Sequence, residues 1–208
     1  MKTSINDIEY KELLFKYNSA LKVLELELNI LGEEFLINNN YNPIEHIKSR
    51  IKKVESIKEK LKRKNLEFNI SNIVNYINDV VGVRIVCSFE NDVYDLVNLI
   101  KSVTNLIIID EKDYIKNPKE SGYSSYHLNI LVPIFLSSGM EYIKSEIQIR
   151  TMAMDFWASI DHKISYKYPG ELDHNIKKEL IKSSKEIRNL DLKMSDLDNR
   201  LHKNNKKI

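Results

Sequence analysis

Apolar residues recur at intervals of three and four near both ends of the chain. The first stripe is Leu13, Leu14, Tyr17, Leu21, Leu24, Leu28 and Leu31, which predicts an amphipathic helix from about Ile8. Asparagines 38–40 and Asn42-Pro43 are typical of the end of such a helix. The second stripe is Ile176, Leu180, Ile187, Leu190, Met194, Leu197 and Leu201. This stripe requires a partner helix, and the first helix of the same or another chain is the candidate.

Strand-type patterns occupy the middle of the chain. They cover 44–52, 81–87, 106–109, 123–132 and 146–150. The segment 81–87 is apolar and β-branched, which is typical of a buried central strand. Ser137-Ser138-Gly139 predicts a hairpin turn, so the last two strands should be antiparallel neighbours. That pairing would bring Tyr123 and His127 close to the strand 146–150.

Shorter helices are expected between the strands. They cover about 56–64, 73–79 (a helix or a turn), a segment beginning at an N-cap on Asn91 or Asp92, and a segment after Arg150 that stops at Tyr168-Pro169-Gly170. A polar stretch, 110–114, should follow the strand 106–109. The order of elements predicts an α/β (α+β) fold with a mixed five-stranded sheet flanked by helices.

Composition excludes several classes of protein. The chain has 208 residues, a net charge of +2 and one cysteine, Cys87. No apolar run approaches the roughly 18 residues of a membrane span, and residues 1–7 lack the apolar core of a signal peptide. A single cysteine excludes an internal disulfide framework and suits a reducing cytoplasm. We therefore expect a cytoplasmic protein whose overall charge is too small to indicate nucleic-acid binding.

The strand 146–150 alternates strictly between polar and apolar residues. Glu146, Gln148 and Arg150 share one face, while Ile147 and Ile149 point into a core. The alternatives are a solvated edge strand and the floor of a site. Arg84 inside an apolar strand either closes an ion pair or faces a ligand, because arginine is rarely buried without a partner.

Motifs for several chemistries are absent from the sequence. The lone cysteine and five scattered histidines give no zinc spacing, and neither a GxxxxGK[ST] loop nor a GxGxxG fingerprint occurs. What remains is a pair of carboxylates, Asp79 and Glu146, with a set of basic and aromatic residues. The basic and aromatic set is Arg50, Lys52, Lys60, Arg63, Arg84, Lys119, Tyr123 and His127. Two carboxylates can hold Mg²⁺ beside substrate phosphates, so the set indicates phosphoryl or pyrophosphoryl transfer or nucleotide binding. The basic block 48–64 is otherwise a solvated helix face or a site for short RNA.

Four motifs resemble a known family. They are Asp79-x-x-Gly82-x-Arg84, the run 112–119 (Lys112-Asp113-Tyr114-Ile115-x-Asn117-Pro118-Lys119), Gly122-Tyr123-x-Ser125-x-His127, and Glu146-x-Gln148-Ile149-Arg150-Thr151. In order and spacing, residues 42–168 resemble the synthetase domain of RelA/SpoT-type (p)ppGpp synthetases, in their small stand-alone branch. The resemblance implies three segments: an N-terminal helical extension (1–41), a nucleotidyltransferase-like catalytic domain (42–168), and a C-terminal oligomerisation helix (169–208).

The resemblance also implies an activity and a site. The enzyme would move the β,γ-pyrophosphate of ATP to the 3′-hydroxyl of GDP or GTP, giving AMP and a stringent-response alarmone. Asp79 and Glu146 would bind Mg²⁺, with Glu146 a ligand or the base. The ATP site would comprise Arg50 and Arg84 around the adenine and Lys52, Lys60 and Arg63 on the phosphates. The acceptor site would comprise Tyr123 on the guanine, with Lys119, His127 and Lys112.

The resemblance leaves some features open. Small relatives form tetramers, so a homotetramer through the terminal helices is expected. The loop Glu120-Ser121-Gly122-Tyr123-Ser124 departs from the family's Pro-Asn-Gly-Tyr, which puts the choice among GTP, GDP and GMP in question. The alternative function is a catalytically weak nucleotide- or RNA-binding module on the same fold.

Overall fold

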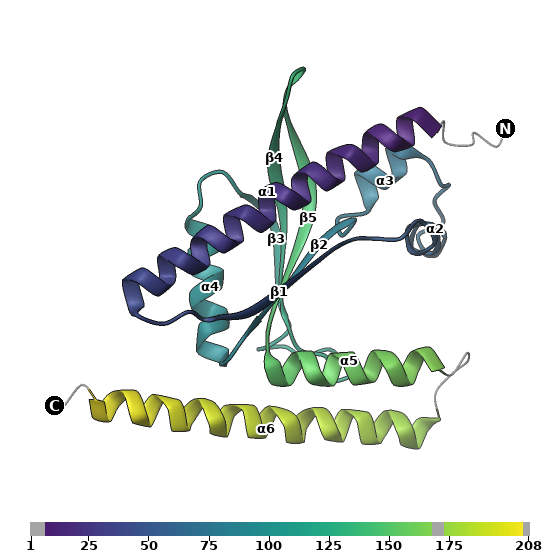
Figure 1. Cartoon of the computed structure of the whole chain (residues 1–208). Coiled ribbons are helices and arrows are strands. Elements are labelled where there is room, and N and C mark those ends of the chain that lie inside the picture. Colours follow the sequence, from purple (N-terminus) through teal and green to yellow (C-terminus); the bar gives the residue numbers. More distant parts are fainter. Residues whose placement is uncertain (1–6, 168–172, 206–208) are drawn as a thin grey trace.

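The computed structural model describes residues 7–167 and 173–205, and it contains six helices and five strands in this part of the chain. The elements in chain order are α1 (Asp7–Asn39), β1 (Ile44–Ile51), α2 (Val54–Arg63), α3 (Ile70–Tyr76), β2 (Val81–Cys87), α4 (Glu90–Ser102), β3 (Ile107–Asp113), β4 (Tyr126–Leu136), β5 (Gly139–Thr151), α5 (Met152–Lys167) and α6 (His174–Asn205). Figure 1 shows the long helix α1 crossing the sheet, with α5 and α6 together at one end of the strands.

The strands form one mixed sheet in the order β1-β2-β5-β4-β3. The pair β2 and β5 is parallel, and the other neighbours are antiparallel. The predicted mixed five-stranded sheet and the β4–β5 hairpin are therefore confirmed. The tip of that hairpin projects beyond the other strands (Figure 1).

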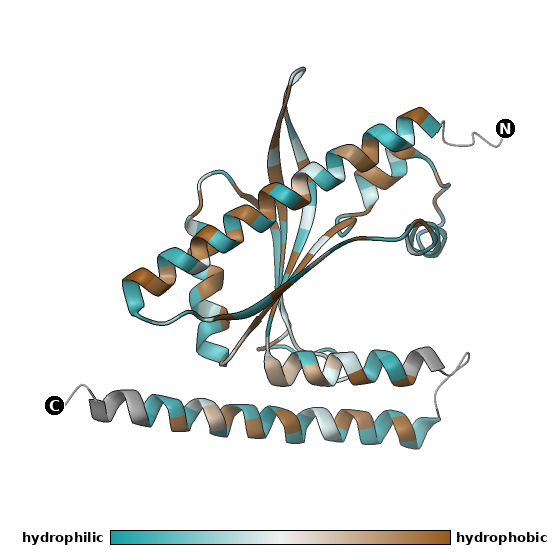
Figure 2. Ribbon diagram, viewed as in Figure 1, coloured by the Kyte–Doolittle hydropathy of each residue, from teal (hydrophilic) through white to brown (hydrophobic). Residues whose placement is uncertain are grey.

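Helices cover one face of the sheet and form the core with it. The apolar stripe of α1 packs there through residues such as Leu24 and Leu28, which are fully buried. Helix α4 contributes Leu96 and Ile100 to the same cluster, and β5 contributes Ile147. Figure 2 shows hydrophobic residues recurring along α1, as its spacing of threes and fours predicts. The N-terminal helix is thus part of the core of the sheet.

Several predicted boundaries were wrong. Helix α3 spans Ile70–Tyr76 and not 73–79. Helix α4 begins at Glu90, because the Asp92 carboxylate accepts the backbone N–H of Phe89 (2.9 Å) from a position inside the first turn. The polar stretch after Ile109 continues strand β3 to Asp113, because those residues pair with β4. Tyr123 lies in a loop, and β4 begins three residues later, at Tyr126. The predicted stop at Tyr168-Pro169-Gly170 falls outside the described residues.

Helix α6 has partners other than the predicted one within this chain. It packs against α5 and α4 at the end of the sheet away from α1 (Figure 1). Trp157 Nε1 of α5 donates to the Leu180 carbonyl (3.1 Å), and the buried Thr151 hydroxyl donates to Asp191 (2.6 Å). These contacts hold α6 against α5 and against the C-terminal end of β5, next to Arg150.

Candidate active site

The face of the sheet opposite the core carries two rows of polar residues that cross all five strands. Directly paired residues share a face, so the strand register defines each row. The first row is Lys48, Arg84, Gln148, His127 and Lys112. The second row is Arg50, Gly82, Glu146, Asn129 and Asp110. A mainly cationic row therefore lies beside a row that contains carboxylates.

A pocket opens on this face over β1, β2 and β5. Its walls include Lys48, Arg50 and Arg84, and its carboxylates are Asp79 and Glu146. Gly82 lies in the second row between Arg50 and Glu146, and it leaves the space that a side chain would occupy. The predicted carboxylates and both predicted adenine-binding arginines thus line one cavity.

Asp79 is held by two lysines just before β2. Lys52 Nζ lies 2.5 Å from Oδ2, and Lys60 Nζ lies 2.9 Å from Oδ1. Burial raises the pKa of this carboxyl, but the two lysines outweigh burial and hold it below the ordinary value. Asp79 is therefore ionised at neutral pH, and the lysines predicted to bind phosphate lie within reach of the pocket.

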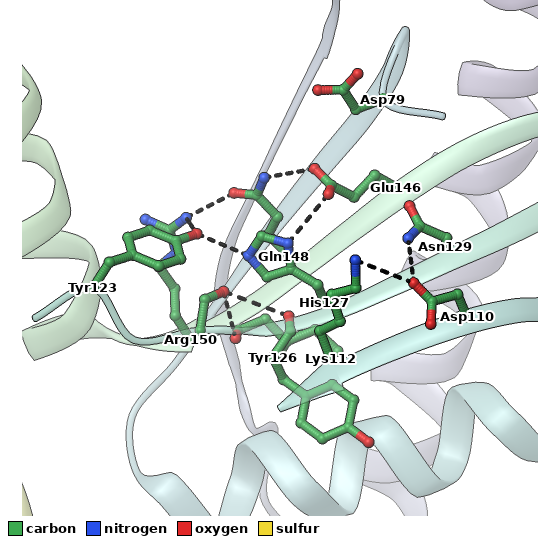
Figure 3. Close-up of polar contacts among 12 residues, drawn as sticks. Asp79, Asp110, Lys112, Tyr123, Tyr126, His127, Asn129, Glu146, Gln148 and Arg150 are labelled. Atoms are coloured by element: carbon green, nitrogen blue, oxygen red, sulfur yellow. Dashed lines mark hydrogen bonds and ion pairs between the residues drawn. The ribbon is translucent and has the colours of Figure 1, made fainter. Parts of the chain in front are cut away.

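Five side chains form a closed ring of hydrogen bonds that includes Glu146 (Figure 3). Arg150 donates to the Tyr123 hydroxyl (2.9 Å) and to Gln148 Oε1 (2.7 Å). Gln148 Nε2 donates to Glu146 Oε2 (2.7 Å), while His127 Nδ1 lies 3.1 Å from Glu146 Oε1. Tyr123 and His127 Nε2 close the ring at 2.9 Å.

The ring has a consistent direction when His127 is neutral with its proton on Nδ1. Tyr123 then donates to His127 Nε2, and Nδ1–H donates to Glu146. The ring thus has two arms, which are chains of hydrogen bonds that both begin at Arg150. One passes through Tyr123 and His127 and the other through Gln148, and they end on the two oxygens of Glu146. Burial raises the pKa of Glu146, but the hydrogen bond from His127, the positive charge that His127 carries when protonated, and the hydrogen bond from Gln148 together prevail and lower it. The ring fixes an ionised carboxylate in one orientation.

The loop before β4 holds an aromatic cluster above this ring. The Lys119 ammonium lies 4.8 Å from the centre of the Tyr123 ring and 4.6 Å from that of Tyr114. Tyr114 also meets the His127 ring edge-on at 5.2 Å. Two backbone hydrogen bonds close the loop, from Lys119 N to Tyr123 O (3.0 Å) and from Gly122 N to Lys119 O (2.8 Å). The loop therefore places a cation and two aromatic rings beside His127 and the hydrogen-bond ring.

Comparisons with known proteins agree with this geometry. Residues 49–171 match the family described as "Region found in RelA / SpoT proteins". GTP pyrophosphokinase YwaC of Bacillus subtilis is 44% identical over 194 residues, which are 93% of this chain and 91% of that protein. The chain belongs to the RelA/SpoT family.

Solved structures of the RelA/SpoT family share the fold over almost the whole chain. Small alarmone synthetase 2 of B. subtilis superposes with a TM-score of 0.84 at 43% identity, covering 92% of this chain and 99% of that one. Small alarmone synthetase 1 of B. subtilis, bound to its product pppGpp, superposes with a TM-score of 0.85 at 34% identity, covering 93% and 98%. The flanking helices are thus included in the likeness.

Two of the residues predicted for this RelA/SpoT site lie at its margin. Arg63 is exposed at the end of α2 and does not line the pocket. Lys112 belongs to the cationic row, but its ammonium is turned to Asp110 at 3.5 Å (Figure 3). The structure brings the other predicted residues together in the pocket, the Asp79 ion pairs and the Tyr123 loop.

Several residues that build the site of this RelA/SpoT protein were not predicted. Gln148 and Arg150 were placed on the polar face without a role, yet they complete the ring. Lys48 lines the pocket, and Tyr114 joins the aromatic cluster. The alternation of β1 and β5 indicated the faces of Lys48, Gln148 and Arg150, but only the strand register shows what they contact.

The carboxylates suit a metal that takes most of its ligands from substrate and water. Asp79 and Glu146 share the pocket, and the charge of Asp79 acts to raise the pKa of Glu146. Within 7–167 and 173–205, no cluster of three or more metal-binding side chains occurs. Two carboxylates fit Mg²⁺, which keeps several waters and substrate phosphates as ligands.

A separate finding concerns membranes. None of the helices in the described residues is long and apolar enough to cross one.

Proposed function

We propose that this protein is a GTP pyrophosphokinase, which transfers the β,γ-pyrophosphate of ATP to the 3′-hydroxyl of GDP or GTP. The observation that carries the proposal is the fixed, ionised Glu146 beside Asp79, in a pocket whose other charged walls are cationic. Phosphoryl-type transfer requires mainly positioning and charge stabilisation, which such a pocket supplies. The likeness to GTP pyrophosphokinases over more than nine-tenths of the chain supports the same reaction.

The donor ATP would lie over β1 and β2. Arg50 and Arg84 would hold the adenine, since a planar guanidinium stacks on aromatic faces. When ATP enters, Lys52 and Lys60 would leave Asp79 and bind the ATP phosphates instead. Arg63 would bind the phosphate farthest from the adenosine. This exchange would free Asp79 at the moment when a metal–nucleotide complex arrives, because the same two lysines neutralise it in the absence of ligand.

Asp79 and Glu146 would hold Mg²⁺. The ion supplies positive charge to the transferring phosphates when it is bound. Asp79 would contribute an oxygen once the lysines move to the phosphates, and Glu146 has lone pairs left over beside its two hydrogen bonds. Mg²⁺ is thus the expected cofactor, held by few protein ligands.

The acceptor nucleotide would lie over β4 and the loop before it. Tyr123 would stack on the guanine, with Lys119, His127 and Lys112 towards the acceptor phosphates. Glu146 would accept a hydrogen bond from the attacking 3′-hydroxyl and orient it. Its lowered pKa makes it a weak base, and this suits a loose transition state in which little proton transfer precedes bond formation.

The purified protein, with ATP, GDP and Mg²⁺, is expected to release AMP and a guanine nucleotide that carries a 3′-pyrophosphate. Chromatography with phosphorus NMR identifies both products. The reaction should stop without acceptor or with a chelator. Nucleotide or single-stranded RNA binding without any product would instead support the alternative of a binding module on the same fold.

Acceptor preference should depend on Glu120. This exposed residue is the second of a turn closed by the Gly122 N–H and the Lys119 carbonyl, where proline fits well. Its charge would repel the acceptor's 5′ phosphates. Glu120→Pro and Glu120→Gln are expected to raise kcat/KM for GTP relative to GMP by about two- to fivefold, the range of an exposed charge interaction.

Turnover of GTP, GDP and GMP by the three proteins measures this preference. Glu120→Gln removes the charge and keeps the backbone free, so it separates the two effects of proline. An ordinary GDP/GTP preference that neither substitution changes would refute the role of Glu120.

We also propose a cytoplasmic homotetramer. Hydrophobic residues remain exposed along both terminal helices, notably Leu26 and Ile30 on α1 and Leu190, Met194 and Leu197 on α6. Such stripes at spacings of three and four suit helix pairing between subunits. The buried thiol of Cys87 agrees with a reducing compartment. Light scattering on the purified protein gives the subunit count, and a monomer would contradict the assembly.

A further inference from the structure

Asp155 contacts two arginines that belong to different parts of the site. Strand β5 runs directly into α5, so this carboxylate lies in the first helical turn, only five residues after Arg150. Its Oδ1 lies 3.2 Å from Arg84 and 3.3 Å from Arg150. The Asp155 side chain is 13% exposed, and that of Arg150 is 3% exposed. One shielded oxygen therefore joins two guanidinium groups.

The two arginines serve opposite halves of the pocket. Arg84 lines the cavity over β1 and β2, where the donor is proposed to bind. Arg150 begins both arms of the hydrogen-bond ring that reaches Tyr123 and Glu146. A change in the position of either arginine therefore reaches one substrate's site directly and the other through Asp155.

The arginines require a negative charge between them. Burial lowers the pKa of Arg150, and the positive charge of Arg84 lowers it further, while Asp155 acts in the opposite direction. Without the carboxylate, two cations would face each other in a partly desolvated place, and each would be driven from its present geometry. The N-terminus of α5 also favours a carboxylate at this position.

We propose that Asp155 is a positioning residue that holds Arg84 for the donor and Arg150 for the acceptor, and so couples the two substrate sites. This inference rests on the proposed function. Asp155 itself neither lines the pocket nor belongs to the ring, so it acts through the arginines.

Steady-state kinetics of Asp155→Asn tests the proposal. Asparagine keeps the shape and loses the charge. The KM for ATP and the KM for GDP are both expected to rise about tenfold, a factor typical of losing one hydrogen bond to a charged group. Asp155→Glu, which restores the charge, should recover part of both losses. Asp155→Ser is a second uncharged variant, with a smaller side chain, and it should behave as Asp155→Asn does.

Asp161→Asn is the matched control, because it removes the same charge from the same helix. It should leave both KM values within twofold of the wild type. Unchanged KM values in a folded Asp155→Asn, a rise in one KM alone, or equal impairment of Asp155→Glu would overturn the proposal.

A binding measurement separates this inference from the proposed function. Calorimetry with a non-hydrolysable ATP analogue should show about tenfold weaker binding to Asp155→Asn than to the wild type, the same factor as for KM. That result would support the role of Asp155 even if the wild type made no alarmone. Equal affinity in the two proteins, with the wild type active, would refute the role and leave the function standing.

Discussion

Glu146→Gln is expected to lower kcat by about 10²- to 10⁴-fold, the range for loss of a group that assists proton transfer or orients the nucleophile. Glutamine keeps the size of the side chain. Its single oxygen can still accept from His127 or from Gln148, but no longer from both. The variant would also lack the charge proposed to hold Mg²⁺ and the 3′-hydroxyl.

Substrate affinity distinguishes this loss from unfolding. The KM or Kd for ATP should change little, because the donor's proposed side-chain contacts come from β1, β2, Lys52 and α2. Glu141→Gln is the matched control: it lies on the same strand, it is half-buried, and its partner is Lys16 at 2.7 Å on the other face. Turnover of Glu141→Gln should equal that of the wild type. If Glu146→Gln kept more than a tenth of wild-type turnover, Glu146 could not have the proposed role.

The register of the strands explains why the residues of the polar face could be predicted from the sequence and their hydrogen-bond partners could not. Alternation in β5 placed Glu146, Gln148 and Arg150 together, because successive side chains in any strand point to opposite faces. Their partners come from β4 and from a loop, and a shift of one residue in β4 would have turned His127 into the core. Such a register depends on the whole sheet, which local patterns do not define.

The helices, like the strands, have faces that the sequence predicts and packing partners that it does not define. The stripe on α1 predicted its length and its buried side, because one helix face must meet the core. The stripe on α6 indicated a partner helix, but the candidate that it suggested, α1, is not the one in this chain, where α6 packs against α5 and α4. The role of Asp155 could not be predicted from the sequence either, because Asp155 and its partner Arg84 are 71 positions apart (155 − 84).

Gly122 lies where the loop before β4, which carries Tyr123, touches α6. Its backbone conformation favours glycine, with φ +91°. A Cβ at this position would lie 2.7 Å from the Ser184 Cβ and closer still to its hydroxyl oxygen. The serine cannot turn its Cβ away, because that atom is fixed to the helix backbone. An added methyl group would therefore force the loop and α6 apart.

Gly122→Ala is expected to raise the KM for the acceptor by about tenfold or more, which lies within the range of a lost base–aromatic stack. The neighbouring Tyr123 would leave its hydrogen bonds with His127 and Arg150. The KM for ATP should stay within twofold, and the melting temperature should fall. The backbone strain alone costs about 1–2 kcal/mol.

Gly139→Ala separates the strain from the clash. Gly139 also has a positive φ, +126°, but no atom lies within 4 Å of the place that a methyl group would take at this hairpin turn. That variant should lose some stability and keep both KM values. Gly122→Ala combined with Ser184→Gly should regain part of the acceptor affinity, because the second substitution removes the atoms that the methyl group meets. An acceptor KM that stayed at the wild-type value in Gly122→Ala would show that α6 does not set the position of Tyr123.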